Sequence, residues 1–184
     1  MANVLTPEQV WNVLADLLST LEAHGEPTSV YVIGGAAIAL ENPDRFATND
    51  IDGYIRHTET RKIIDASDIF APVQTKWGLE TDWFNFRAEG LGPPVAGPEA
   101  FHEVMRVGNA VLYAANTDAL LAMKLNAARG RDMPDLEYLL GACKIATLHE
   151  AEAAFERYYP GDGLSDTAIA RVQAIVAAPG PATH

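Results

Sequence analysis

Apolar positions recur with helical spacing near the start of the chain. Residues 5–25, LTPEQVWNVLADLLSTLEAHG, carry an apolar stripe with a period of three to four residues, which predicts an amphipathic helix. We expect Thr6 to cap this helix, with Pro7 in its first turn and Gly25 at its end. The next apolar run, TSVYVIGG at 28–35, is short, rich in β-branched residues and closed by two glycines, which indicates a buried strand.

The elements that follow alternate between short helices and short strands. We predict a brief helix over 36–42 and a second strand over 50–55. A helix over 58–70 and two further strands, 81–86 and 109–116, complete this part of the chain. Alternation of this kind is typical of an α/β fold.

The pattern changes after residue 116, where only helical segments remain. Four of them follow one another, at 117–130, 133–145, 147–159 and 164–176. Thr117, Thr147 and Ser165 are expected to be N-caps, because their hydroxyls can accept a backbone N–H in the first turn.

We therefore predict an α/β (α+β) protein built around a small mixed sheet flanked by helices. Residues 1–116 would form the α/β core with its N-terminal helix, and residues 117–184 a helical region packed on that core. The tail from about residue 178 is expected to be disordered, because it is short and rich in Pro and Gly.

Charge and composition narrow the possible functions. The net charge of -12 argues against a large nucleic-acid footprint, since such binding depends on neutralising phosphates. The single cysteine, Cys143, excludes a disulfide within the chain. No apolar run reaches membrane-spanning length, and the N-terminus lacks the layout of a signal peptide, so we expect a cytoplasmic protein without membrane contact.

The sequence D-I-D at the second strand carries the first candidate chemistry. Asp50 and Asp52 would project from the same face of a strand, about 7 Å apart, where like charges repel unless a cation joins them. Carboxylate oxygens are the ligands that Mg²⁺ prefers, and the flanking Ile51 and Ile55 indicate a buried strand. The plainer alternative is a pair of surface aspartates at a strand edge.

Gly34 and Gly35, between the first strand and the short helix, are the second candidate. A strand that runs into two glycines and a helix leaves backbone N–H groups free to hold a phosphate, with help from the helix dipole. A tight strand-to-helix turn without a ligand is the alternative.

Together these features resemble the nucleotidyltransferase fold of the DNA polymerase β type. The wording GGAAIAL followed by DRFATNDID resembles the AbiEii-type nucleotidyltransferases, many of which are toxins of toxin–antitoxin pairs. The resemblance implies that Gly34 and Gly35 hold a nucleoside triphosphate, and that Asp50 and Asp52 bind Mg²⁺. It also assigns substrate contacts to Arg45, one place further from the threonine than usual, and Thr48.

A second stretch, residues 120–140, extends this resemblance. Relatives carry a lysine on a helix and then R-D-x-x-D-L, which here matches Lys124, Arg131, Asp132, Asp135 and Leu136. The implied role of Lys124 is a contact to the triphosphate, where its charge would offset charge developing at phosphorus. The carboxylates would orient Lys124 or another basic group. A solvated turn between two helices is the alternative.

A third carboxylate is the open point of the predicted site. Two-metal phosphoryl transfer usually uses another acid, and Asp82 heads the strand that offers one. Relatives resemble this stretch with D-W-x-N followed by an acid, but Phe86 occupies that last position here.

The resulting prediction is a Mg²⁺-dependent nucleotidyltransferase that moves a nucleotide from a nucleoside triphosphate to an acceptor hydroxyl. The resemblance implies a tRNA 3′ end as acceptor and a cognate antitoxin as protein partner, with a protein hydroxyl or an aminoglycoside as other acceptors. The absent acid at Phe86 favours a second possibility, an inactive nucleotidyltransferase-like antitoxin or interaction module. A small α/β protein with a coincidental D-x-D is the third.

Overall fold

A computed structural model of the chain describes residues 4–25, 27–44, 47–58, 67–86 and 97–178. Within these ranges the residues form two compact units. The first ends at Ala115, and the second contains Gly97 and the residues from Asn116 onward. The first unit contains the sheet, and the described residues of the second unit form helices joined by turns.

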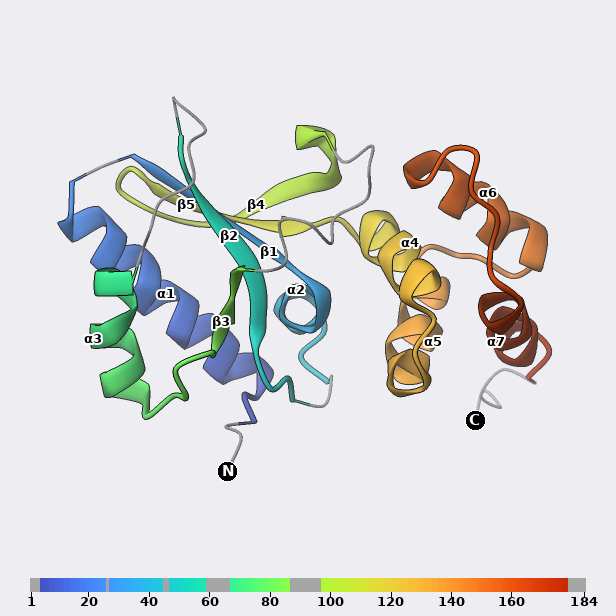
Figure 1. Ribbon diagram of the computed structural model, residues 1–184, viewed down its shortest axis with the longest axis horizontal. Helices are drawn as coiled ribbons and strands as arrows, with labels where there is room; N and C mark the ends of the chain where they lie inside the picture. The colour runs from blue at the N-terminus through green and yellow to red at the C-terminus, as the bar shows by residue number, and fades with distance from the viewer. Residues whose placement is uncertain (1–3, 26, 45–46, 59–66, 87–96, 179–184) are drawn as a thin grey trace. The chain divides into compact units, whose positions relative to one another are not determined.

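A five-stranded mixed sheet forms the centre of the first unit, so the expected α/β fold class is confirmed (Figure 1). The strand order is β3-β2-β1-β5-β4. The central strand β1 pairs antiparallel with β2 and parallel with β5, while β3 runs parallel to β2 and β4 antiparallel to β5. The strands are β1 (Thr28–Ile33), β2 (Ile51–His57), β3 (Phe84–Asn85), β4 (Phe101–Val107) and β5 (Ala110–Ala115).

The helices of this unit are α1 (Pro7–Ala23), α2 (Gly34–Glu41), α3 (Ser67–Trp77) and the short η2 (Pro98–Ala100). Helix α1 begins with the predicted capping box, in which the Thr6 hydroxyl accepts from the backbone of Gln9 and the Gln9 side chain accepts from the backbone of Thr6. Its apolar stripe is buried, and α1 lies beside α3 (Figure 1). Burial of this stripe, rather than helix propensity, fixes α1 on the core.

The side chains of strand β2 alternate between a buried face and a half-buried face of the sheet. Ile51, Gly53 and Ile55 are buried on one face, whereas Asp52 and Tyr54 alternate with them and are half-buried on the other. The first aspartate of the D-x-D pair, Asp50, lies just before the strand begins. The face that carries Asp52 is therefore the one on which a polar site can form.

Aromatic rings gather on this same face. Tyr31 stacks between Tyr54 and Tyr113, with ring centroids 4.8 and 5.2 Å apart, and Phe101 meets Tyr31 edge-on. The Arg56 guanidinium lies 4.8 Å from the centre of the Tyr54 ring. Cross-strand aromatic pairs of this kind stabilise strand register, here across β2, β1 and β5.

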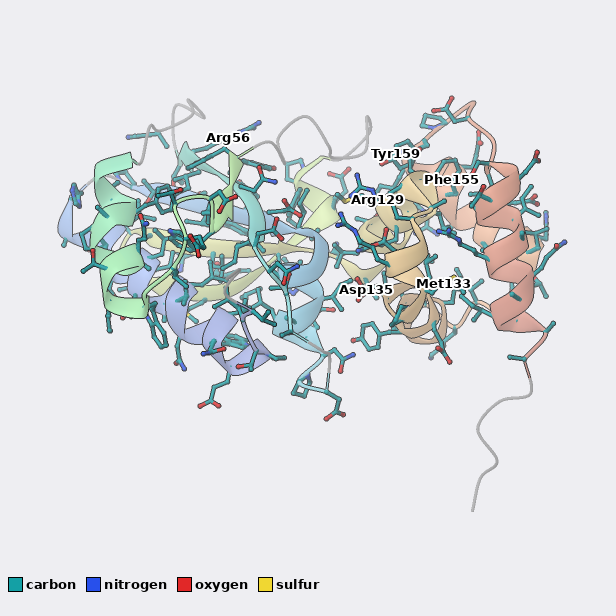
Figure 2. All side chains as sticks on the ribbon, turned by 60° about the horizontal axis from the view of Figure 1, so that its bottom comes forward. Arg56, Arg129, Met133, Asp135, Phe155 and Tyr159 are labelled. Carbon is teal, nitrogen blue, oxygen red and sulfur yellow. The ribbon has the colours of Figure 1, made fainter. Side chains whose placement is uncertain are left out.

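The second unit contains α4 (Thr117–Ala127), η3 (Gly130–Asp132), α5 (Met133–Ala142), α6 (Leu148–Tyr158) and α7 (Asp166–Val176). Thr147 and Ser165 cap α6 and α7 as predicted. Helix α4 differs, since Asn116 is its N-cap and Thr117 its first residue. Phe155 and Tyr159 stack with centroids 4.8 Å apart (Figure 2). No helix in the described ranges is long and apolar enough to cross a membrane.

Several boundaries differ from the sequence prediction. The strand β4 was not predicted, and the strand expected over 81–86 is reduced to Phe84–Asn85. The helix expected over 58–70 falls partly outside the described residues, and α3 continues to Trp77. Arg45 and the tail beyond Ala178 also lie outside the described residues.

An ion pair between α1 and α3 leads to a pH prediction. Burial raises the pKa of the Asp16 carboxyl, but hydrogen bonds from Lys76 and Trp77 outweigh it and the pKa is lowered. Because the pKa of Asp16 is lower in the folded protein, its carboxylate stabilises the fold at pH values above the pKa of an unfolded aspartate, about 3.9. This stabilisation is lost as the pH falls through the pKa of the folded protein. We expect Asp16→Asn to cost up to about 1 kcal/mol at pH 7.

Urea unfolding of both proteins between pH 7 and pH 2.5 measures this effect. The difference in unfolding free energy between wild type and Asp16→Asn is expected to shrink below about pH 4. A difference that stays constant across this range would show that the carboxylate charge is not the source of the stabilisation.

Candidate functional site

The junction of β1 and α2 lies against the second aspartate of the D-x-D pair. Ile33, the last residue of β1, pairs with Asp52 across the ladder, and Gly34 follows it with φ of +64°. A Cβ built on Gly34 would lie 3.0 Å from Oδ2 of Asp52. Any side chain at residue 34 would therefore press on the Asp52 carboxylate, and the start of α2, where a helix dipole favours negative charge, lies beside that carboxylate.

The N-terminus of α2 is the predicted phosphate-binding turn. Its N-cap, Ile33, cannot accept a hydrogen bond through its side chain, and the first turn contains no acidic residue. Gly34 and Gly35 are the first two helical residues, so they carry N–H groups that have no partner within the helix itself. Such groups can donate to an anion.

Asn85 faces Asp52 from the neighbouring strand. The two residues are partners in the parallel β2–β3 register, and Nδ2 of Asn85 donates to Oδ1 of Asp52 over 2.8 Å. Phe86, where the family resemblance predicts an acid, packs instead against Phe70 and Phe84. The residue of β3 that lies beside Asp52 is therefore Asn85, which carries an amide, and not Phe86.

Asp50 lies in a different environment from Asp52. It lines a hollow of about 130 Å³ at the start of β2, and Asp82 lines the same hollow. The full lining consists of Leu5, Asn49, Asp50, Leu79, Glu80, Asp82 and Trp83. Asp82, the predicted third acid, is exposed and shares this hollow with Asp50. The residue that is hydrogen-bonded to Asp52 is instead Asn85.

Thr48 holds the segment that leads to Asp50. Its backbone exchanges two hydrogen bonds with Leu5, of 2.7 and 2.9 Å, and its hydroxyl donates to the Asp50 carbonyl oxygen over 3.1 Å. Thr48 is buried. Of the two substrate contacts expected near the D-x-D pair, Thr48 therefore positions the backbone before β2, and Arg45 falls outside the described residues.

Lys124 forms a buried ionic cluster within the second unit. Its Nζ lies 2.6 Å from Oδ1 of Asp132 and 2.9 Å from Oδ2 of Asp135, and the Lys124 side chain is 15% exposed. This arrangement ties α4 to η3 and α5, where Asp135 lies in the first turn (Figure 2). Arg131 between them is exposed on η3. The expected meeting of Lys124 with the aspartates of the first unit stays a prediction.

The donor set of the first unit suits a hard cation that brings its own ligands. Asp50 and Asp52 offer carboxylate oxygens, which Mg²⁺ prefers. Among the described residues, no group of three or more His, Cys, Asp or Glu side chains is placed to hold a metal ion. An Mg²⁺ ion bound with a nucleotide usually takes one or two carboxylates and fills the rest of its octahedral shell with water and substrate phosphate.

The close contact at Gly34 leads to a stability prediction. Gly34→Ala is expected to cost about 2 to 4 kcal/mol, because alanine is strained at a positive φ and its methyl group would press on Asp52. Gly25→Ala is a matched control, since Gly25 also has a positive φ, of +80°, but a Cβ there meets nothing within 4 Å. Urea unfolding should give a clearly smaller loss for Gly25→Ala, and equal losses would remove the Asp52 contact as the cause.

The chain was also compared with known proteins. No family model matches it, and neither a curated protein nor a solved structure with significant similarity was found.

Proposed function

We propose that the protein is a Mg²⁺-dependent nucleotidyltransferase that moves a nucleoside monophosphate from a nucleoside triphosphate to an acceptor hydroxyl. The observation that carries this proposal is the position of the Asp52 carboxylate beside Gly34, where a built Cβ atom would lie 3.0 Å from Oδ2. It brings a turn suited to binding phosphate next to a ligand suited to binding Mg²⁺. A mixed sheet flanked by helices, with D-x-D at the start of its second strand, supports the same interpretation.

Each residue then has a separate task. The N–H groups of Gly34 and Gly35 bind the triphosphate, and the carboxylates of Asp50 and Asp52 hold the cation. Bound Mg²⁺ supplies charge that polarises the phosphoryl oxygens. The acceptor oxygen forms a bond to the α-phosphorus, and the bond from that phosphorus to the bridging oxygen breaks. Pyrophosphate leaves with the electron pair, and the hydroxyl proton passes to a carboxylate of the site.

Residues of the second unit and of the hollow have supporting parts in this proposal. The family resemblance assigns Lys124 a contact to the triphosphate, and within the second unit Asp132 and Asp135 hold its ammonium group. Arg131 and Arg45 are further cations for substrate binding. Asp82, beside Asp50, is the candidate acid that accepts the hydroxyl proton.

The proposed acceptor is a tRNA 3′ end, in a cytoplasmic toxin that has a cognate antitoxin. The net charge of -12 supports a small contact area with RNA, limited to the end of the strand. The alternative acceptors are a protein hydroxyl and an aminoglycoside. The acidic hollow at Asp50, Glu80 and Asp82 favours the aminoglycoside, because an aminoglycoside is cationic.

One observation favours a second function, that of a nucleotide-binding module without catalysis. The side chain of residue 85, which is bonded to Asp52, is an amide, so this position does not supply a third acid. A protein of this kind would bind nucleotide and use the complex to recognise a partner, as an antitoxin or interaction module.

The experiment that separates these functions follows the transferred label. The protein is incubated with each α-labelled nucleoside triphosphate, Mg²⁺, and total tRNA, and RNA and protein are then separated by electrophoresis. Parallel reactions contain an aminoglycoside in place of tRNA. Label on an acceptor from at least one nucleotide supports the transferase. Absence of label on all three acceptor classes, from folded protein that binds nucleotide, would leave the binding module.

A further inference from the structure

The side chains of Asn85 and Asp52 are hydrogen-bonded, and the two residues lie side by side on neighbouring strands. They are register partners on parallel strands, so their Cβ atoms project from the same face of the sheet. The two side chains meet over 2.8 Å, and the Asn85 side chain presents its nitrogen to the carboxylate. A cation bound by Asp52 on this side would therefore meet the side chain of residue 85 directly.

The chemistry of residue 85 decides how well an isolated cation is held. In this orientation the amide presents its N–H₂ group, which cannot ligate a cation, and turning its Oδ1 toward the cation would break the hydrogen bond to Asp52. A carboxylate at this position would instead add a hard oxygen ligand and a negative charge. The same hydrogen bond gives the Asp52 carboxylate a partner within the protein when no cation is bound. Asn85 therefore makes the cation-free site stable and the nucleotide-free metal site weak.

We propose that Asn85 is a positioning residue that makes cation binding at Asp52 depend on bound nucleotide. This inference rests on the proposed function, since the triphosphate must supply the ligands that residue 85 does not. In the absence of nucleotide, Asp50 and Asp52 provide too few oxygens to hold Mg²⁺ against water. When a triphosphate binds at Gly34, its oxygens complete the shell, and the cation and the nucleotide enter together.

Two simpler roles for Asn85 lead to different behaviour. If the amide only joins β3 to β2, its replacement changes stability but not the affinity for metal. If any added negative charge strengthens metal binding, an aspartate elsewhere in the first unit has the same effect. Asn12, on α1, provides that charge control in the variant Asn12→Asp.

The test measures Mn²⁺, a paramagnetic substitute for Mg²⁺, by electron paramagnetic resonance of the free ion. Titrations are run with metal alone and with each of the four α,β-methylene nucleoside triphosphates, which resist transfer. In the wild type, at least one nucleotide is expected to raise the affinity of the protein for Mn²⁺ at least tenfold. Asn85→Asp is expected to raise the affinity for Mn²⁺ alone at least tenfold, and Asn12→Asp less than twofold.

A charge-swapped variant keeps the test decisive if two adjacent carboxylates prevent folding. The double variant Asp52→Asn with Asn85→Asp retains one amide and one carboxylate. It is expected to regain the nucleotide-dependent Mn²⁺ binding that Asp52→Asn alone loses. Two results would overturn the proposed role of Asn85 without affecting the proposed function. One is a double variant that does not regain nucleotide-dependent Mn²⁺ binding, and the other is a folded Asn85→Asp protein whose affinity for Mn²⁺ without nucleotide is unchanged. A wild-type protein in which no nucleotide raises Mn²⁺ affinity would overturn the proposed function as well.

Discussion

Replacing Lys124 by methionine is expected to lower the free energy of unfolding by about 3 to 5 kcal/mol. The variant leaves Asp132 and Asp135 buried without their shared cation, and these carboxylates are only 7% and 10% exposed. Breaking a buried ion cluster by removing one partner is costly because the remaining charges lose their compensation. Urea unfolding followed by circular dichroism measures the effect, since α4 and α5 both lie in the helical unit.

The matched control removes all three charges together. In the variant Lys124→Met with Asp132→Asn and Asp135→Asn, the cluster carries no uncompensated charge, so most of the lost stability should return. If the single variant is as stable as the wild type, the ion cluster makes no net contribution to the stability of the fold. Comparing the triple variant with the double variant Asp132→Asn, Asp135→Asn isolates the loss of the Lys124 charge, because these two proteins differ only at residue 124.

Replacing Asp52 by asparagine is expected to lower the rate of nucleotide transfer at least about a hundredfold. The proposed cation contributes several kcal/mol to stabilising the transition state, and each 1.4 kcal/mol corresponds to about a factor of ten in rate. Transfer of α-label at saturating nucleotide measures the rate. Mg²⁺ with nucleotide at a hundredfold excess over its dissociation constant should also stabilise the wild type by about 2.7 kcal/mol, and this gain should disappear in Asp52→Asn.

Asp16→Asn is the control for this substitution, because Asp16 is also a carboxylate that accepts a side-chain N–H, from Trp77 on α3. It should keep both the transfer rate and the thermal stabilisation by nucleotide. An Asp52→Asn protein that melts with the same nucleotide-dependent shift as the wild type would remove Asp52 from the metal site. Loss of the shift in both variants would point to general destabilisation instead.

The elements that the sequence predicts well are those with strong local signals. Helix α1 combines a capping box with an unbroken apolar stripe, and both are observed. Strand β1 and its Gly-Gly end are likewise local features, and Gly34 has the positive φ that explains a glycine there. Strand β4 escaped prediction because none of its side chains is fully buried, so its polar and apolar residues carry no clear alternation.

Which residues surround Asp52 depends on the register between strands β2 and β3. The local sequence pattern of either strand does not reveal that register. The family resemblance places the third acid at the position of Phe86, but the parallel pairing of β2 with β3 puts Asn85 beside Asp52. The one signal for this in the sequence is a single amide within the aromatic run TDWFNF. The partners of Lys124 lie within eleven residues of it, which is why the sequence motif already contains Asp132 and Asp135.

The central strand β1 also determines when the first unit can fold. Thr28 pairs with Ala110 in the parallel β1–β5 ladder, so these partners are 82 residues apart in the chain (110 minus 28). Contacts over such separations form late, because the intervening chain must lose entropy before the pairing is gained. During synthesis, the antiparallel β1–β2 pair emerges long before β5, and one edge of β1 stays unpaired meanwhile. The nascent chain therefore exposes an apolar strand edge until about residue 115, the interval in which aggregation or chaperone binding is expected.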